Sequence, residues 1–545
     1  MKKFILLCTF CWGMLVPGAR ACTSFLAGRN ATIDGSTFIT YAADSHTLYG
    51  ALKFIPAARH PKNSTMEIRE WDTNKLLGHI PQVEYTYKVV GNMNEHQLSI
   101  TESTWGGRPE LVDTTGIIDY GSLMYIALQR AKTAREAITV MTDLVSEYGY
   151  YSSGESFSIA DPEEVWIMEM IGKGPQNQGA VWVAVRIPDD CIAAHANQSR
   201  IHKFPLDDKE NCLYSPDVIS FAREQGYFNG LNKDFSFADT YAPADFGALR
   251  GCEARVWSFY NRFNSSMGKY LSYLNGKSKE YLPLYIKPDK KLSVQDMKDA
   301  MRDHFEGTPF DMTQDVGAGP FKCPYRFRPM TFKVDSVEYT NERAVATQQT
   351  AFTLVAQMRS WLPNAIGGVL WFGVDDTNTC VYVPLYACLN EVPECYSELN
   401  GSMYDLSWTS AFWIHNWVAN MAYSRYDQMI EDIRPVQKDI ETTFNVQQPV
   451  IEKVANDLYR NDPVAAIRFL NAYSVAQAQQ TTVQWKKLGE FLLVKYLDGN
   501  RKKEKGGHFL ENGYGLPADP DFPGYSEEYY RAVAKDAGDR LKVAF

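Results

Sequence analysis

The pattern of apolar and polar positions predicts a chain that opens with antiparallel strands. Thr23 to Gly28 and Thr37 to Ala43 are short strand-like runs, and the stretch between them contains the turn residues Asn30, Asp34 and Gly35. A hairpin is therefore expected at the start. Further strands are expected at VWIMEMIG and AVWVAVRI (165–187), CIAAHAN (191–197), and GVLWFGV with CVYVPLY (368–386).

Helical periodicity appears in the first half of the chain and dominates its end. It is present at 120–148 and 294–304, and over the longer stretches 407–444 and 450–496. Pro435 and Pro463 are expected to kink or interrupt the two long stretches. The pattern thus predicts an α+β domain, mainly antiparallel, at 22–400 and a mainly helical region at 401–545.

The first 21 residues have the layout of a secretory signal peptide. Two lysines begin the chain, Phe4 to Val16 is mainly apolar, and Ala19 and Ala21 lie three and one residues before Cys22. Cleavage after Ala21 would export the protein to the periplasm or the extracellular space and make Cys22 its first residue. The alternative is a lipoprotein signal that acylates this cysteine, but such a signal needs a large aliphatic residue where Ala19 stands.

Composition narrows the possible partners. Without residues 1–21 the formal net charge falls from −10 to −13, because three basic residues are removed. This acidic balance argues against nucleic acid as a partner, and no later apolar run is long and clean enough for a membrane span. No cofactor is expected, and the nine scattered histidines and the absence of a CxxC pair after residue 21 predict no metal site.

A cysteine at the first position of a mature chain can be a nucleophile with its own base. A thiol attacks well only as a thiolate, and a free α-amino group on the same residue titrates near pH 8. That amine could take the thiol proton and return it to a leaving amine. On this feature alone, an ordinary residue after a signal peptide explains Cys22 equally well.

Seven segments, in order, resemble the secreted dipeptidase A family of cysteine peptidases, which belongs to the N-terminal-nucleophile (Ntn) hydrolase superfamily. They are CTSFLAGRNATIDGSTFITYAADSH, VVGNMNEHQLSITEST, GESFSIADPEEVWIMEM, AAHANQSRI, RVWSFYNRF, HFEGTPFDMT and GGVLWFGVDDT. The resemblance implies a four-layer αββα sandwich and cleavage of dipeptides that have a free amino terminus. Dipeptides are thus the expected partners, and a homo-oligomer is left open. Two alternatives remain: an acylase for bile-salt or other acyl amides, as in related families, and a lipid-anchored, non-catalytic surface protein.

The resemblance also assigns roles to residues around Cys22. Asp44 matches an aspartate that orients the α-amine, and Asn94 matches a donor to the tetrahedral oxyanion, with Asn92 as the substitute if the register differs by two. Asn197 matches a second polar residue near the nucleophile, and Arg255 a cation that lowers the thiol pKa. Without the resemblance, Asp44 would be interpreted as a turn aspartate and Asn94 as a turn asparagine. Asn197 would be interpreted as part of an Asn-x-Ser sequon, and Arg255 as a surface arginine.

One position departs from the family pattern. Related sequences carry an arginine shortly before the aspartate, whereas Tyr41 stands there in this chain and is expected to donate a hydrogen bond or to leave the task to Arg255. Glu102 and Glu169 are candidates to bind the substrate ammonium group, although Glu169 is equally well explained as a structural carboxylate. Structural roles are favoured for three histidines and three tryptophans in the matching segments: His46, His96, His195, Trp105, Trp166 and Trp257.

Overall fold

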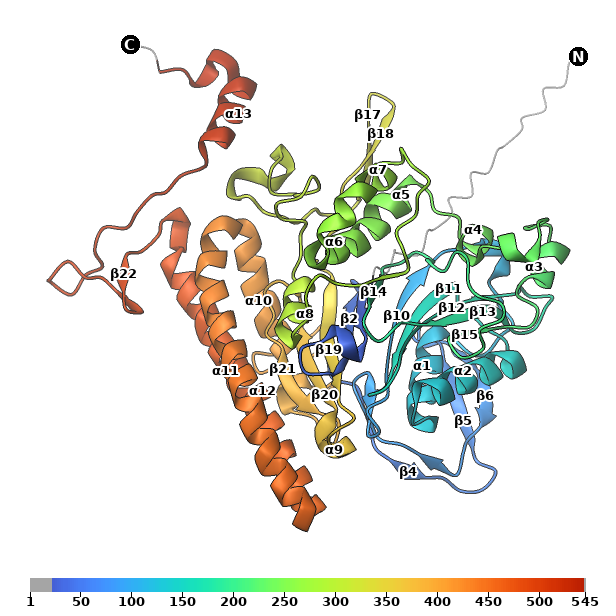
Figure 1. Cartoon of the computed structure of the whole chain (residues 1–545). Helices are drawn as coiled ribbons and strands as arrows, with labels where there is room; N and C mark the ends of the chain where they lie inside the picture. Colours follow the sequence, from blue (N-terminus) through green and yellow to red (C-terminus); the bar gives the residue numbers. More distant parts are fainter. Residues whose placement is uncertain (1–21, 544–545) are drawn as a thin grey trace, which may run out of the picture.

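Two large antiparallel sheets form the centre of the molecule, which we describe from a computed structural model covering residues 22–543 (Figure 1). The predicted leader, residues 1–21, lies outside the described residues. The seven-stranded sheet has the order β16 (Tyr285–Ile286), β14 (Ile192–His195), β1 (Ser24–Ala27), β2 (Thr37–Asp44), β19 (Thr350–Met358), β20 (Val369–Val374) and β21 (Val383–Tyr386). The eight-stranded sheet has the order β15 (Cys212–Tyr214), β13 (Ala180–Arg186), β12 (Val165–Gly172), β11 (Gly154–Ala160), β10 (Ser99–Trp105), β9 (Met93–Asn94), β8 (Val89–Val90) and β3 (Phe54–Ile55).

The strand pairs expected from the sequence are confirmed. The pairs β1–β2, β12–β13 and β20–β21 are each antiparallel neighbours, and the stretch CIAAHAN contains β14, which pairs with β1. Four two-stranded sheets lie outside the large sheets: β4 (Ala58–Arg59) with β7 (Tyr85–Thr86), β5 (Thr65–Arg69) with β6 (Leu76–Pro81), β17 (Thr331–Val334) with β18 (Val337–Thr340), and β22 (Glu504–Lys505) with β23 (His508–Phe509).

Strand β12 shows why several strands read as continuous apolar runs. Successive side chains of a strand point to opposite faces, and both faces of this strand are buried. Ile167 and Ile171 belong to the core shared with the seven-stranded sheet. Trp166 and Met168 belong to a second core beneath α1 and α2. The two sheets meet face to face, as the contact at 3.2 Å between the hydroxyl groups of Ser24 in β1 and Thr101 in β10 illustrates.

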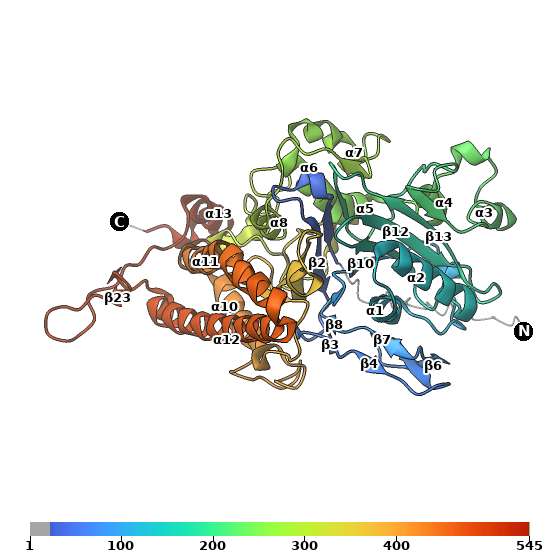
Figure 2. The ribbon, with the colours of Figure 1, turned by 60° about the horizontal axis from the view of Figure 1, so that its bottom comes forward.

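Helices cover the outer faces of both sheets (Figure 2). Helices α1 (Tyr120–Arg130) and α2 (Ala134–Tyr148) pack on the eight-stranded sheet. On the seven-stranded sheet lie α6 (Ala254–Phe263), α8 (Val294–Ala300), α10 (Ala411–Ser424), α11 (Tyr426–Asn461) and α12 (Pro463–Lys495). The short helices are α3 (Ser220–Glu224), α4 (Phe237–Tyr241), α5 (Phe246–Ala248), α7 (Leu271–Leu274), α9 (Asn364–Gly367) and α13 (Glu527–Ala537).

The proline expectations met different outcomes. Pro463 separates two helices, since it is the first residue of α12 and Asp462 caps that helix by accepting a hydrogen bond from the Ala465 amide. Pro435, in contrast, does not interrupt α11, which continues for 36 residues. A proline inside a helix costs about 3 kcal/mol, and α11 offsets this cost by burying apolar residues such as Ile433 and Phe444. No helix in residues 22–543 combines the length and apolar character needed to cross a bilayer.

Candidate active site

Cys22 lies immediately before β1, in the middle of the seven-stranded sheet and against β10 of the other sheet. It is buried, with 5% of its surface exposed. Its thiol donates to the Oε1 atom of Glu102 at 3.3 Å and lies 3.7 Å from the hydroxyl of Tyr41. The Tyr41 hydroxyl donates to the same Glu102 oxygen. Neighbouring strands thus bring the predicted nucleophile together with two residues that were predicted to bind substrate.

The surroundings of the thiol keep it protonated. Burial raises the pKa of Cys22 well above its ordinary value, and the nearby carboxylates of Glu102 and Asp44 raise it further. The hydrogen bond between Cys22 and Tyr41 acts in the opposite direction on this pKa. Because the thiolate is the nucleophilic form, Cys22 needs a base to become reactive.

A cavity of about 140 Å³ opens beside the thiol. This volume is below the about 300–1,000 Å³ typical of sites for drug-sized ligands, so the cavity can enclose only a small part of a substrate. Two carboxylates, Glu102 and Asp72, are among its walls, and the Oε2 atom of Glu102 is buried without a hydrogen-bond partner among the described residues. The lining residues are Cys22, Tyr41, Ala43, Asp44, Ser45, Thr47, Leu48, Trp71, Asp72, Glu102 and Tyr120.

Asp44 lies at the end of β2 and lines the same cavity. Arg343 forms an ion pair with its Oδ2 atom, and Thr350 donates to its Oδ1 atom at 2.6 Å. Burial raises the pKa of Asp44, while Arg343 and Thr350 favour the ionised form. Arg343 was missed by sequence reasoning, because no motif marks a single arginine in the segment between β18 and β19.

Arg255 and Asn197 hold the backbone around Cys22. The Arg255 guanidinium donates to the carbonyl of Cys22 at 2.8 Å, to Thr23 Oγ1 at 2.7 Å and to Asn197 Oδ1 at 2.9 Å. Asn197 in turn donates to the carbonyl of Thr104 at 2.6 Å. Burial, followed by the charge of Arg343, lowers the pKa of Arg255 to about 10, which leaves it cationic at neutral pH. Arg255 is therefore a buried residue that fixes the backbone of Cys22, not a surface arginine.

Asn94 is not among the residues that line the cavity. Its amide nitrogen donates to the carbonyls of Leu128 and Ala131 at 2.7 and 2.8 Å, and its oxygen accepts from the amides of His96 and Leu98. These four bonds close the β9–β10 turn and attach it to the end of α1. In this arrangement the side chain has no N–H group left for an oxyanion. The amide of the substitute Asn92 donates to the Ile100 carbonyl at 2.9 Å.

Glu169 also lies away from the cavity. It is fully buried on β12 and accepts hydrogen bonds from Ser199 and from the backbone amides of Arg200 and Ile201. These contacts favour the structural interpretation of this carboxylate over substrate binding. Its position organises the loop after β14, in which Asn197 lies.

His195 is neutral and already engaged, in keeping with the structural role favoured for it. Both ring nitrogens of His195 contact hydroxyl groups, Ser103 at 2.6 Å and Ser158 at 2.7 Å. Burial, with the charges of Arg200 and Arg255, lowers the pKa of His195 to about 3. Trp105, Trp166 and Trp257 are buried core residues.

The described residues show neither a metal site nor a disulfide. Residues 22–543 contain no group of three or more histidine, cysteine, aspartate or glutamate side chains placed to hold a metal ion. All eight of their cysteines are free.

Comparison with known proteins adds an independent finding. The family model described as Peptidase family C69 matches residues 21–439. A protein named "Probable dipeptidase" from Latilactobacillus sakei is 27% identical over 425 residues, which is 74% of this chain and 82% of that protein. A protein with the same name from Salmonella dublin is 26% identical over 408 residues, which is 71% of this chain and 85% of that protein. A "Probable dipeptidase B" from Streptococcus pyogenes serotype M1 is 23% identical over 512 residues (88% and 94%).

Proposed function

The chain belongs to peptidase family C69, and on that basis we propose that it is an exported dipeptidase whose nucleophile is Cys22 as the first residue of the mature protein. The observation that carries the proposal is the placement of the Cys22 thiol in a small cavity beside the carboxylate of Glu102. The names of the relatives, each called a probable dipeptidase, support the same substrate class.

The proposed reaction begins when the leader is removed. While Ala21 is attached, the Cys22 nitrogen is an amide and cannot act as a base; after cleavage it is an amine that can accept the thiol proton. The sulfur then attacks the peptide carbonyl, the amine returns the proton to the leaving nitrogen, and a thioester forms. The carboxy-terminal amino acid leaves at this step. Water then hydrolyses the thioester, which releases the amino-terminal amino acid and restores the thiol. The raised pKa of Cys22 supports the need for such a base.

Substrate recognition follows from the two carboxylates of the cavity. We assign Glu102 and Asp72 to the substrate ammonium group, since a positive charge there would offset the negative charges next to the thiol. Tyr41, which replaces the family arginine, donates to Glu102 and limits its repulsion of a forming thiolate. Asp44 is assigned to orient the α-amine, and Arg255 with Asn197 to position Cys22.

The same proposal extends to the fold and the organisation of the chain. Two facing antiparallel sheets with helices on both outer faces support an αββα Ntn-hydrolase sandwich, with the nucleophile at the start of an inner strand. We assign residues 22–400 to this catalytic domain and 401–545 to a helical region that packs on the seven-stranded sheet. Residues 1–21 are assigned to the export signal.

Two preparations of the same protein test the mechanism. One begins at Cys22, and the other carries a single acetylated residue before it; Cys22→Ala with an unchanged melting temperature serves as the inactive control. Dipeptide hydrolysis by the first preparation alone supports the α-amine as base. Equal hydrolysis by both would refute it and direct attention to Glu102, whose carboxylate lies 3.3 Å from the thiol. Hydrolysis of an acyl amide but of no dipeptide would overturn the substrate assignment in favour of an acylase.

A further inference from the structure

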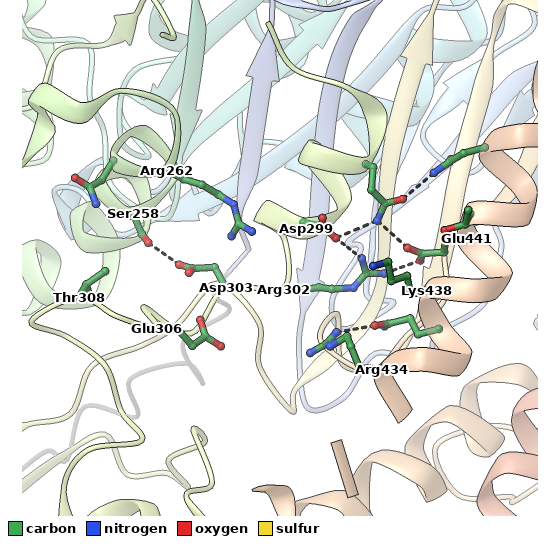
Figure 3. A pocket seen from close by; sticks show the side chains of 15 residues that line it. Ser258, Arg262, Asp299, Arg302, Asp303, Glu306, Thr308, Arg434, Lys438 and Glu441 are labelled. Carbon is green, nitrogen blue, oxygen red and sulfur yellow. Dashed lines mark hydrogen bonds and ion pairs between the residues drawn. The ribbon is translucent and has the colours of Figure 1, made fainter. Parts of the chain in front are cut away.

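A second and larger cavity lies on the opposite side of the seven-stranded sheet from α1 and α2. Its volume is about 750 Å³, and it lies between α6, the segment that follows α8, and α11 (Figure 3). It shares no lining residue with the cavity at Cys22. Its size falls in the range of small-molecule binding sites, and the residues that line it all have polar or charged side chains.

Some of the charges in this cavity neutralise each other. Arg302 pairs with Glu441 at 2.6 Å and with Asp299 at 3.0 Å, which forms a closed ionic cluster on one side. Arg434 is held by the carbonyl of Asn378 at 2.9 Å and by Gln437 at 2.6 Å. These side chains form the frame of the cavity.

Two further cations line the cavity. Arg262 on α6 and Lys438 on α11 are exposed to solvent and form no hydrogen bond and no ion pair with any of residues 22–543, and Figure 3 shows the Arg262 side chain extending into the cavity. Two carboxylates, Asp303 and Glu306, lie on the remaining side. Ser258 donates to Asp303 at 2.6 Å, and Glu306 pairs with the ring of His304 at 3.1 Å. Burial and the charge of Glu306 raise the pKa of Asp303 to about 6, whereas the hydrogen bond from Ser258 and the charge of Arg262 act in the opposite direction.

We propose that this cavity binds a small zwitterion of the amino-acid class, with its carboxylate at Arg262 and Lys438 and its ammonium group at Asp303 and Glu306. Charge-assisted hydrogen bonds of this kind are the strong ones in binding sites. The ligand side chain would lie along amide and hydroxyl groups that line the cavity: Gln295, Thr442 and Asn445.

The cavity is also connected to the strand that carries Tyr41 and Asp44. The Sδ atom of Met301, in the segment that follows α8, accepts a hydrogen bond from the hydroxyl of Thr40 at 3.0 Å. Thr40 directly precedes Tyr41 in β2. The carbonyl of Asp303 accepts the amide of Ala346 at 3.1 Å, three residues after Arg343. A ligand that shifts this segment would therefore also shift residues of the active site. This link between the two cavities rests on the proposed dipeptidase function, whereas ligand binding itself does not.

Calorimetry on the full chain carrying Cys22→Ala tests binding without any turnover. The probe is L-glutamine, compared with glutaramate, which lacks the ammonium group, and with 4-aminobutanamide, which lacks the carboxylate. We expect glutamine to bind at least tenfold more tightly than either analogue. Adding Arg262→Gln and Lys438→Gln should weaken glutamine binding at least tenfold, whereas adding Glu102→Gln, in the other cavity, should leave it unchanged.

Three results would overturn the site: no heat from millimolar glutamine, equal binding of glutamine and glutaramate, or binding that survives the double substitution. Because Cys22→Ala removes hydrolysis from the experiment, these results are independent of the proposed reaction. The link is tested in the active enzyme, where added glutamine should change kcat/KM for a dipeptide and the double substitution should remove that change. A change that persists in the double variant, or no change at all, refutes the link.

Discussion

Tyr41→Phe probes the contact that distinguishes this active site. The substitution keeps the ring and its edge contact with Phe352, whose centroid is 5.7 Å away, and removes only the hydroxyl that donates to Glu102. A hydrogen bond to a charged group contributes about 1.5–3 kcal/mol. Without it, the Glu102 carboxylate opposes the negative charge that develops on the Cys22 sulfur, and each 1.4 kcal/mol lost at the transition state slows the reaction about tenfold.

We therefore expect kcat/KM for dipeptide hydrolysis to fall between about tenfold and about a hundredfold. The hydrogen bond between Cys22 and Tyr41 lowers the pKa of Cys22, so its loss should raise that pKa. Because burial holds this pKa well above its ordinary value in either protein, both thiols stay largely protonated from pH 6 to pH 9, and the deficit should be similar at the two ends of this range. The assay is steady-state release of free amino acid, measured across this pH range.

The matched control is Tyr241→Phe. Tyr241 is also fully buried, and its hydroxyl donates to the neutral carbonyl of Val218 at 2.7 Å and not to a group assigned to catalysis. It should lose stability but keep its kcat/KM. The reasoning fails if Tyr41→Phe stays within about twofold of the wild type, or if the control loses as much activity.

Three further substitutions test other parts of the structure. Asn94→Ala removes four hydrogen bonds, so it should lower the free energy of unfolding by about 2–4 kcal/mol with little effect on kcat. A decrease of kcat by about 10²–10³ at unchanged stability would instead establish the oxyanion role. Arg255→Lys cannot reach the Cys22 carbonyl and Asn197 together, so kcat should fall at least about tenfold while KM changes little; an unchanged kcat contradicts the positioning role. Burial lowers the pKa of Lys298 to about 7, so between pH 7 and about 10 the unfolded chain binds more protons and stability rises with pH. Relative to Lys298→Met, the wild type should gain about 2 kcal/mol between pH 7 and 9 in denaturant unfolding, and a constant difference would show that the lysine is already charged when folded.

The sequence predicts the parts of this fold that depend on local pattern. The apolar run of β12, the turn between β1 and β2 and the amphipathic helices are each encoded within a few residues, so they could be located. The segment at 120–148 shows the limit of that approach: periodicity predicts helix throughout, but Thr133 caps a new helix and the structure contains two. Pro435 shows another limit, because packing against the sheet outweighs a local preference.

The site divides in the same way. Cys22 and Asp44 lie in a segment with a family resemblance and could be named in advance. Asp72 and Tyr120 reach the cavity from a turn and from the start of a helix, and Arg343 pairs with Asp44 from a loop. No spacing in the sequence relates these three positions to Cys22, since only the stacking of the sheets brings them together. Asn94 shows the opposite limit. A residue at a motif position can perform the role of its counterpart in the family only if its side-chain donors are not already used in other hydrogen bonds.

The burial of Cys22 has a consequence for chemical probes and inhibitors. A general alkylating reagent would react first with the more exposed thiols of Cys252 and Cys323, so bulk loss of titratable thiols would say nothing about the catalytic one. A selective electrophile must be small enough for a cavity of about 140 Å³ and should carry an ammonium group for Glu102. An α-aminonitrile carries its nitrile carbon where the scissile carbonyl of a dipeptide would lie, and this carbon can accept the sulfur while the nitrile nitrogen takes up the thiol proton. Such a compound should therefore label Cys22 in preference to the other seven cysteines of residues 22–543.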